Sequence, residues 1–175
     1  PDCYDKLGTY AQMNPPIRDK SHYDRLWYAV KNNLNDTIGS DHAPHLQKNK
    51  EKIYPNSPSG MPGVQTLMPV MLDHVNAKKL SLDQLINFVC ENPVRIFGIK
   101  NKGFIREKYD ADFTIVDMNK KIVIKNENIE SKCKWSPFNN CEFKGTPVAT
   151  IIGGKTKMKD GKILGEPEGT PLIFN

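Results

Sequence analysis

One carboxylate and two imidazoles fall close together between Asp41 and His45, in the run Asp-His-Ala-Pro-His. Side chains of these types bind divalent metals, transfer protons near neutral pH and bind anions. Residues 36–40 precede the run, and Thr37 and Ile38 give them the character of a short buried strand. Because parallel α/β folds carry their chemistry at the carboxyl ends of strands, we expect an active site here. The alternative is a structural strand end with an Asp that caps a turn.

A second polar group follows another predicted strand. Residues 9–13 have the pattern of a strand, and the Asn-Pro-Pro sequence that begins at Asn14 excludes a helix interior. Ser21 and Asp24 resemble a capping box and start a helix with an apolar stripe. The order strand, loop, helix, strand predicts a βαβ unit with Asn14 and Asp41 on the same rim.

The chain between residues 46 and 63 is expected to be loop. Residues 46–57 are polar without periodicity, and 58–63 are rich in proline and glycine, which let backbone approach a ligand closely. A plain surface turn fits this composition equally well. Residues 48–52, Lys-Asn-Lys-Glu-Lys, form the densest basic run. Because a glutamate interrupts it, we expect a solvated surface rather than a nucleic-acid patch.

The composition changes near residue 100, where helical periodicity gives way to short β runs. Helices are expected over 64–75, over 82–91 with a Ser81–Gln84 capping box, and from Pro93 to a stop at Gly98. The β runs lie at 113–116, 122–124 and 148–152, followed by a hairpin turn at Asp160 and Gly161. We therefore predict two domains, 1–100 and 101–175.

Composition excludes several classes of protein. The 175 residues are 38% hydrophobic and 26% charged with a net charge of +5, which is typical of a globular chain with one ordinary core. No apolar run approaches the roughly 18 residues needed to span a membrane, and no signal segment opens the chain. We expect a cytoplasmic protein that binds neither nucleic acid nor a membrane.

The four cysteines argue against a zinc ribbon, because none forms a Cys-x-x-Cys pair. Cys90 is expected in the core on the apolar side of its predicted helix. Cys133 and Cys141 flank a Trp-Ser-Pro-Phe turn and could approach each other. Without a secretory signal, all four thiols are expected to be reduced.

Three motifs follow one another along the chain: Asn-Pro-Pro-Ile-Arg at 14–18, Ser-Asp-His-Ala-Pro-His at 40–45 and Ser-Gly-Met-Pro-Gly at 59–63. In this order they resemble signatures of the dihydroorotases, which are cyclic amidohydrolases of the amidohydrolase superfamily. The segments 110–117 and 153–155 are similar to the C-terminal β domain of the superfamily. The resemblance implies an α/β fold: the C-terminal part of a TIM (β/α)8 barrel, with its last two strands and following helices, plus part of a small β-sandwich.

The resemblance also implies a role for each motif residue. Asp41 resembles the carboxylate that binds one metal and transfers the proton during catalysis. His45 resembles the residue that contacts the substrate carboxylate. Asn14 resembles the side chain that hydrogen-bonds the pyrimidine ring, and Ser59 and Gly60 match the loop whose backbone contacts the ring amide.

Two further residues are expected to support these groups. His42 is interpreted as a residue that orients the loop without touching substrate. Arg18 either holds the loop by pairing with a carboxylate or is an ordinary surface residue. The implied cofactor is a divalent metal, zinc before others, as one or two ions.

The family pattern needs more metal ligands than this chain contains. It calls for a His-x-His pair, a bridging acidic group and two further histidines. The chain has four histidines, His22, His42, His45 and His74, and no His-x-His. Two predicted strands also cannot close a barrel. We therefore expect an incomplete C-terminal part, inactive alone, whose first partner is the N-terminal remainder of the same protein.

The activity implied is reversible, metal-dependent hydrolysis of dihydroorotate to N-carbamoyl-aspartate in pyrimidine biosynthesis. Another cyclic amidohydrolase, an allantoinase or a hydantoinase, is the alternative enzyme, although the second histidine of the 41–45 run favours a dihydroorotase. A non-catalytic dihydroorotase-like scaffold for aspartate transcarbamoylase is the alternative of another class. The remaining partners expected are a second copy of the chain or aspartate transcarbamoylase.

Overall fold

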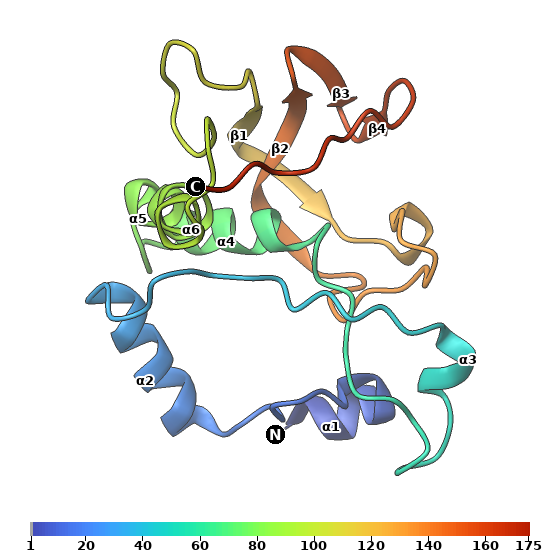
Figure 1. Ribbon diagram of the computed structural model, residues 1–175. Coiled ribbons are helices and arrows are strands. Elements are labelled where there is room, and N and C mark those ends of the chain that lie inside the picture. The colour runs from blue at the N-terminus through green and yellow to red at the C-terminus, as the bar shows by residue number, and fades with distance from the viewer. Residues whose placement is uncertain (1) are drawn as a thin grey trace.

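The computed structural model describes residues 2–175, with helices in the first part of the chain and one antiparallel sheet in the second. Figure 1 shows α4, α5 and α6 close to the sheet, whereas α1, α2 and α3 lie at the other end of the molecule. The helices are α1 (Asp2–Leu7), α2 (Lys20–Lys31), α3 (Gln47–Lys50), α4 (Leu67–Asn76), α5 (Leu82–Ile86) and α6 (Asn92–Phe97). Shorter helical turns are 3₁₀ at Gly8–Ala11 and Asn126–Asn128, and π at Asn87–Glu91.

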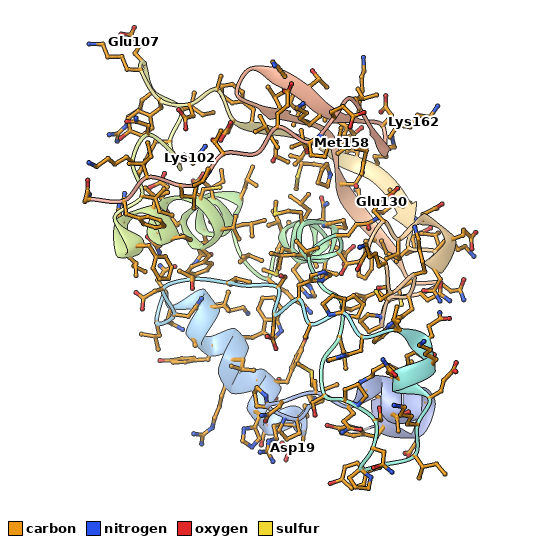
Figure 2. All side chains as sticks on the ribbon, turned by 45° about the vertical axis from the view of Figure 1, so that its right-hand side comes forward. Asp19, Lys102, Glu107, Glu130, Met158 and Lys162 are labelled. Carbon is orange, nitrogen blue, oxygen red and sulfur yellow. The ribbon has the colours of Figure 1, made fainter. Side chains whose placement is uncertain are left out.

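The sheet has the strand order β1-β2-β3-β4, with every neighbouring pair antiparallel. Its strands are β1 (Phe113–Val123), β2 (Glu142–Ile152), β3 (Lys155–Lys159) and β4 (Lys162–Ile163). The predicted hairpin turn at 160–161 is confirmed, and a second tight turn at 153–154 joins β2 to β3. Met158 and Lys162 mark β3 and β4 in Figure 2, on the opposite side of the molecule from Asp19.

The first two β runs are one strand, not two. Its ladder with β2 shifts register between Asp117 and Lys121. There the Asp117 carboxylate accepts hydrogen bonds from the backbone N–H groups of Asn119 at 2.8 Å and Lys120 at 3.1 Å. The side chain thus satisfies the backbone groups that leave the ladder, and the strand resumes after a bulge.

The larger core packs α4 and the α5 segment against the sheet, where Val116 and Met118 of β1 contact it. Its buried members are Met71, Leu72, Leu80, Leu85 and Phe88. Full burial of side chains of this size stabilises the fold by roughly 1.5–3 kcal/mol each. The sheet approaches α4 closely at Gly145, where a Cβ would lie 2.8 Å from Leu72 Cβ, and this requires a residue without a side chain.

Local signals correctly predicted two helix ends. Ser81 and Gln84 form the reciprocal capping box, with the Gln84 N–H donating to Ser81 Oγ at 3.1 Å and Ser81 N–H to Gln84 Oε1 at 3.0 Å. Helix α6 ends at Gly98, whose φ of 64° is in the left-handed region.

Both strands predicted in the first fifty residues are wrong. A 3₁₀ turn occupies Gly8–Ala11 instead of a strand over 9–13. Residues 37–41 form no strand, because the run has no strand partner within residues 2–175, and Thr37, Gly39 and Asp41 are exposed. Extended backbone becomes a strand only when a neighbour pairs with it. Here the pairing is limited to the single bridge His42–Met61.

Helix α2 is capped by Asp19, so the predicted Ser21–Asp24 box is wrong. The Asp19 carboxylate accepts from the Ser21 N–H at 2.9 Å and from its hydroxyl at 2.6 Å, which lowers the pKa of Asp19. The helix therefore begins one residue earlier than expected. Of its predicted stripe, Trp27 and Val30 pack on the larger core, while Leu26 and Leu34 are 68% and 66% exposed.

Cys90 is exposed, contrary to its predicted core position. It lies in the π turn Asn87–Glu91, which adds a residue to the turn and rotates the following side chains away from the α-helical phase. Cys133 is the buried thiol instead, and all four cysteines are free. None of the helices in residues 2–175 is long and apolar enough to cross a bilayer.

We predict that protonation of His74 destabilises the fold in mild acid. Burial against Trp27, 4.7 Å away between ring centroids, lowers the pKa of His74, with Lys79 adding to the shift and Asp73 opposing it. Since the unfolded chain binds this proton more readily, stability falls as pH drops below about 6.5 towards the folded-state pKa. His74→Gln is expected to flatten that loss, as measured by urea unfolding at about pH 5 and about pH 7.5. His22→Gln, on the exposed face of α2, is the control, and equal slopes for His74→Gln and wild type would contradict the assignment.

Candidate active site

The loop that carries Asp41 to His45 is bound to the loop at 58–64. His42 and Met61 form a parallel bridge, and the Ala43 N–H donates to the Met61 carbonyl at 2.9 Å. His42 Nδ1 accepts from the N–H groups of Gly63 at 3.0 Å and Val64 at 3.3 Å. Because Nδ1 is the acceptor, the neutral ring carries its proton on Nε2.

Asp41 adopts a backbone conformation that few residues tolerate. Its φ is 42°, in the left-handed region where Asn and Asp are the commonest residues after glycine. The side chain is exposed, and it forms no ion pair within residues 2–175. The Asp41 carboxylate is therefore free to meet a proton, a metal or a ligand.

His45, Ser59 and Gly60 lie together. His45 Nε2 is 2.9 Å from the Ser59 carbonyl oxygen. At Gly60, with φ of 129°, a Cβ would lie 2.6 Å from Ala43 Cβ and 3.2 Å from His45 Nε2. Only glycine allows this approach, so the composition of the 58–63 loop reflects close packing of two loops.

The segment that contains Asn14 is hydrogen-bonded to the 57–60 loop through Gln12. The Gly60 N–H donates to the Gln12 carbonyl at 2.9 Å, and Gln12 Nε2 donates to the Ser57 carbonyl at 2.8 Å. Asn14 itself is exposed and follows this connection by two residues. The structure thus connects the segments of Asn14, His45, Ser59 and Gly60.

Two predicted residues are not joined to this cluster by an ion pair. Arg18 is exposed and has no carboxylate partner among residues 2–175, so the described contacts give it the surroundings of a surface arginine. Asp41 is connected through its neighbour His42 to Gly63, and not directly to Asn14 or His45.

The described residues do not supply a complete metal centre. Within residues 2–175, no group of three or more His, Cys, Asp or Glu side chains is close enough to hold a metal ion. Asp41 offers carboxylate oxygens, and within the described residues it belongs to no such group. A metal bound at Asp41 would take its remaining ligands from elsewhere.

Two buried side chains hold the site and were missed from the sequence. Lys50 is fully buried and binds the segment of Gln12, although its basic run predicted a solvated surface. Trp135, 2% exposed, donates from its indole N–H to the His45 carbonyl at 2.7 Å. A buried Trp needs an acceptor for its indole N–H, so the sequence could indicate that Trp135 has a hydrogen-bond partner. It could not identify that partner, because His45 lies ninety positions away.

Trp135 belongs to a second core that lies beneath these loops. Its buried members are Ile124, Ile129, Cys133 and Trp135, and Tyr10 and Met61 pack against it. The Tyr10 and Trp135 rings meet edge to face at 4.9 Å between centroids. Residues 124–135, which follow β1, therefore pack against the loops that carry the candidate site residues.

Comparison with known proteins identifies relatives of the whole arrangement. The profile of the Amidohydrolase family matches residues 17–157. The dihydroorotase of Methanosphaera stadtmanae is 39% identical over 162 residues, which are 91% of this chain and 37% of that protein. The dihydroorotase of Pyrococcus furiosus is 37% identical over 170 residues, 97% of this chain and 39% of that protein.

A solved structure has the same fold. The L-hydantoinase (dihydropyrimidinase) from Arthrobacter aurescens superposes with a TM-score of 0.89 at 33% identity, over 94% of this chain and 38% of that one. The chain thus spans less than two-fifths of the length of each of these proteins.

Proposed function

Because this chain belongs to the amidohydrolase family, we propose that it is the C-terminal part of a dihydroorotase. The whole protein would hydrolyse dihydroorotate reversibly to N-carbamoyl-aspartate in pyrimidine biosynthesis. The observation that carries the proposal is the contact of His45 with Ser59 beside Gly60. It puts an imidazole next to backbone polar groups, which suits a small ring that bears both a carboxylate and an amide.

Each side chain of this segment then has a defined task. Asp41 accepts the proton of the attacking water and returns it to the departing ring nitrogen, a role worth about 10²–10⁴ in rate. Since the Ser59 carbonyl accepts, His45 Nε2–H donates to it and fixes the ring orientation, and a second proton on Nδ1 lets that nitrogen donate to the substrate carboxylate. Asn14 hydrogen-bonds the ring.

Within Ser59 and Gly60, the Gly60 carbonyl is the acceptor left for the ring amide. The Gly60 N–H is used by Gln12, and the Ser59 carbonyl is used by His45. We assign the Gly60 carbonyl as the acceptor for the ring N–H. His42 keeps this loop in place through its bonds to Gly63 and Val64.

We propose zinc as the metal of the whole protein, with Asp41 as one of its ligands. The described residues do not fit a metal without further donors, so the other ligands belong to the N-terminal remainder, which is the first partner of this chain. Residues 1–100 would then complete a TIM barrel, and 101–175 a β-sandwich. A second copy of the chain or aspartate transcarbamoylase remains a predicted partner.

The main experiment compares substrates. The whole protein should hydrolyse dihydroorotate faster than hydantoin or allantoin, and no hydrolysis of dihydroorotate would contradict the assignment. The likeness to an L-hydantoinase structure favours hydantoin as the second candidate substrate. A scaffold without activity would hydrolyse none of them and would bind aspartate transcarbamoylase. The 175-residue chain with zinc but without its remainder should be inactive, and turnover by that chain would refute the incomplete site.

His45→Ala in the whole protein is expected to raise KM for dihydroorotate by about 10-fold or more, because a charge-assisted hydrogen bond contributes about 1.5–3 kcal/mol. Bound metal should not change. Steady-state kinetics and metal analysis measure the two quantities. His22→Ala, on the exposed face of α2, is the control. An unchanged KM in His45→Ala would remove His45 from carboxylate binding.

A further inference from the structure

We propose that Lys50 is a positioning residue that fixes the two substrate-binding segments against each other. This inference rests on the proposed function and extends it to a residue outside the motifs. Lys50 ends the short helix α3 and is 0% exposed, whereas its neighbour Lys48 on the same helix is exposed. Fully buried lysines are rare, because desolvating an ammonium group is costly unless hydrogen bonds replace the water.

The ammonium group and the backbone carbonyl of Lys50 each form hydrogen bonds to the segments 9–12 and 57–58. Its Nζ donates to the Gln12 carbonyl at 2.9 Å and to the Pro58 carbonyl at 2.8 Å. Its own carbonyl accepts from the hydroxyls of Thr9 and Ser57, the latter at 3.1 Å. One residue therefore connects 9–12 with 57–58 by four hydrogen bonds.

The groups expected to contact substrate are adjacent to these bonds. Gln12 precedes Asn14 by two residues, and its carbonyl also accepts the Gly60 N–H at 2.9 Å. Pro58 directly precedes Ser59, whose carbonyl contacts His45. Because Lys50 binds these carbonyls on the buried side, it determines the direction in which Asn14, Ser59 and Gly60 present their free groups.

Within residues 2–175, the Lys50 ammonium group donates to these two carbonyl oxygens and forms no ion pair. Burial also lowers the pKa of Lys50. A lysine that served only to stabilise the fold would gain more from a carboxylate. Three directed donors on two carbonyls suit a residue that fixes loop geometry.

The test is Lys50→Met in the whole protein, with Lys48→Met as the matched control. Lys50→Met is expected to raise KM by about 10-fold or more with a smaller change in kcat, because misplaced contacts weaken binding. Hydrogen exchange of the Gly60 amide should also accelerate. Lys48→Met should change neither. A lower melting temperature with unchanged KM and unchanged exchange would reduce Lys50 to a structural role and overturn the proposal.

Two further measurements separate the outcomes. If His45 and Lys50 act on one geometry, the KM effect of Lys50→Met should be smaller in a His45→Ala background, and full additivity would contradict the coupling. Should Lys50→Met fail to fold, Ser57→Ala removes one bond to the Lys50 carbonyl and keeps the ammonium. It should raise KM about 2- to 5-fold, in line with one neutral hydrogen bond, and an unchanged KM would overturn the proposal.

The kinetics use whichever cyclic amide the wild-type protein hydrolyses. If that substrate is hydantoin, the dihydroorotase assignment fails while Lys50 is still tested. If wild type hydrolyses none, exchange at Gly60 decides: acceleration in Lys50→Met supports the positioning role, and an unchanged rate refutes it.

Discussion

Asp41→Asn in the whole protein should lower kcat for dihydroorotate by about 10³-fold or more while leaving the fold intact. The amide cannot accept the proton that the carboxylate takes up, and general acid–base catalysis contributes about 10²–10⁴ in rate. Loss of an anionic metal ligand would add to that effect. Steady-state kinetics and circular dichroism measure activity and fold separately.

Asparagine is the right replacement because of the backbone. Asp41 has φ of 42°, which Asn tolerates, whereas Ala there would add roughly 1–2 kcal/mol of strain. Asp36→Asn makes the same change five residues earlier, at an exposed position whose backbone carbonyl accepts from Asn92 Nδ2. It should keep wild-type kinetics. A near-wild-type rate in Asp41→Asn would exclude Asp41 from the mechanism.

Whether an element could be predicted from the sequence depended on how many positions separate its residues from their hydrogen-bond partners. The Ser81–Gln84 box and the Gly98 stop involve partners within four residues, and both predictions were confirmed. The runs 9–13 and 36–40 have β-like composition, yet a strand needs a hydrogen-bonded neighbour that composition cannot identify.

The same distinction applies to the site. Motifs identified His42, His45 and the 58–63 loop, and the structure joins them by direct bonds. Lys50 was missed because a lysine in a lysine-rich run looks solvated, and its partner Gln12 is thirty-eight positions away. Burial is a property of the assembled fold, so no local pattern distinguishes Lys50 from Lys48.

Gly63→Ala should impair catalysis through sterics alone. A Cβ at Gly63 would lie 2.3 Å from the Ser40 carbonyl oxygen and 3.3 Å from its carbon, and the next residue along is Asp41. Both contacts are backbone, so one of the two loops must move. Misplacing a catalytic group by about 1 Å can cost 10²-fold, and we expect a loss of kcat of that order. Overpacking should also cost about 1–3 kcal/mol of stability.

Gly39→Ala is the matched control, because a Cβ there would meet nothing within 4 Å. It makes the same chemical change two residues before Asp41. Its effect on stability should stay within about 0.5 kcal/mol, with unchanged kcat. Kinetics and thermal unfolding of both variants give the comparison. If Gly63→Ala and Gly39→Ala were equally active, the contact between the two loops would not determine where Asp41 lies, and Asp41 would owe its position to other parts of the protein.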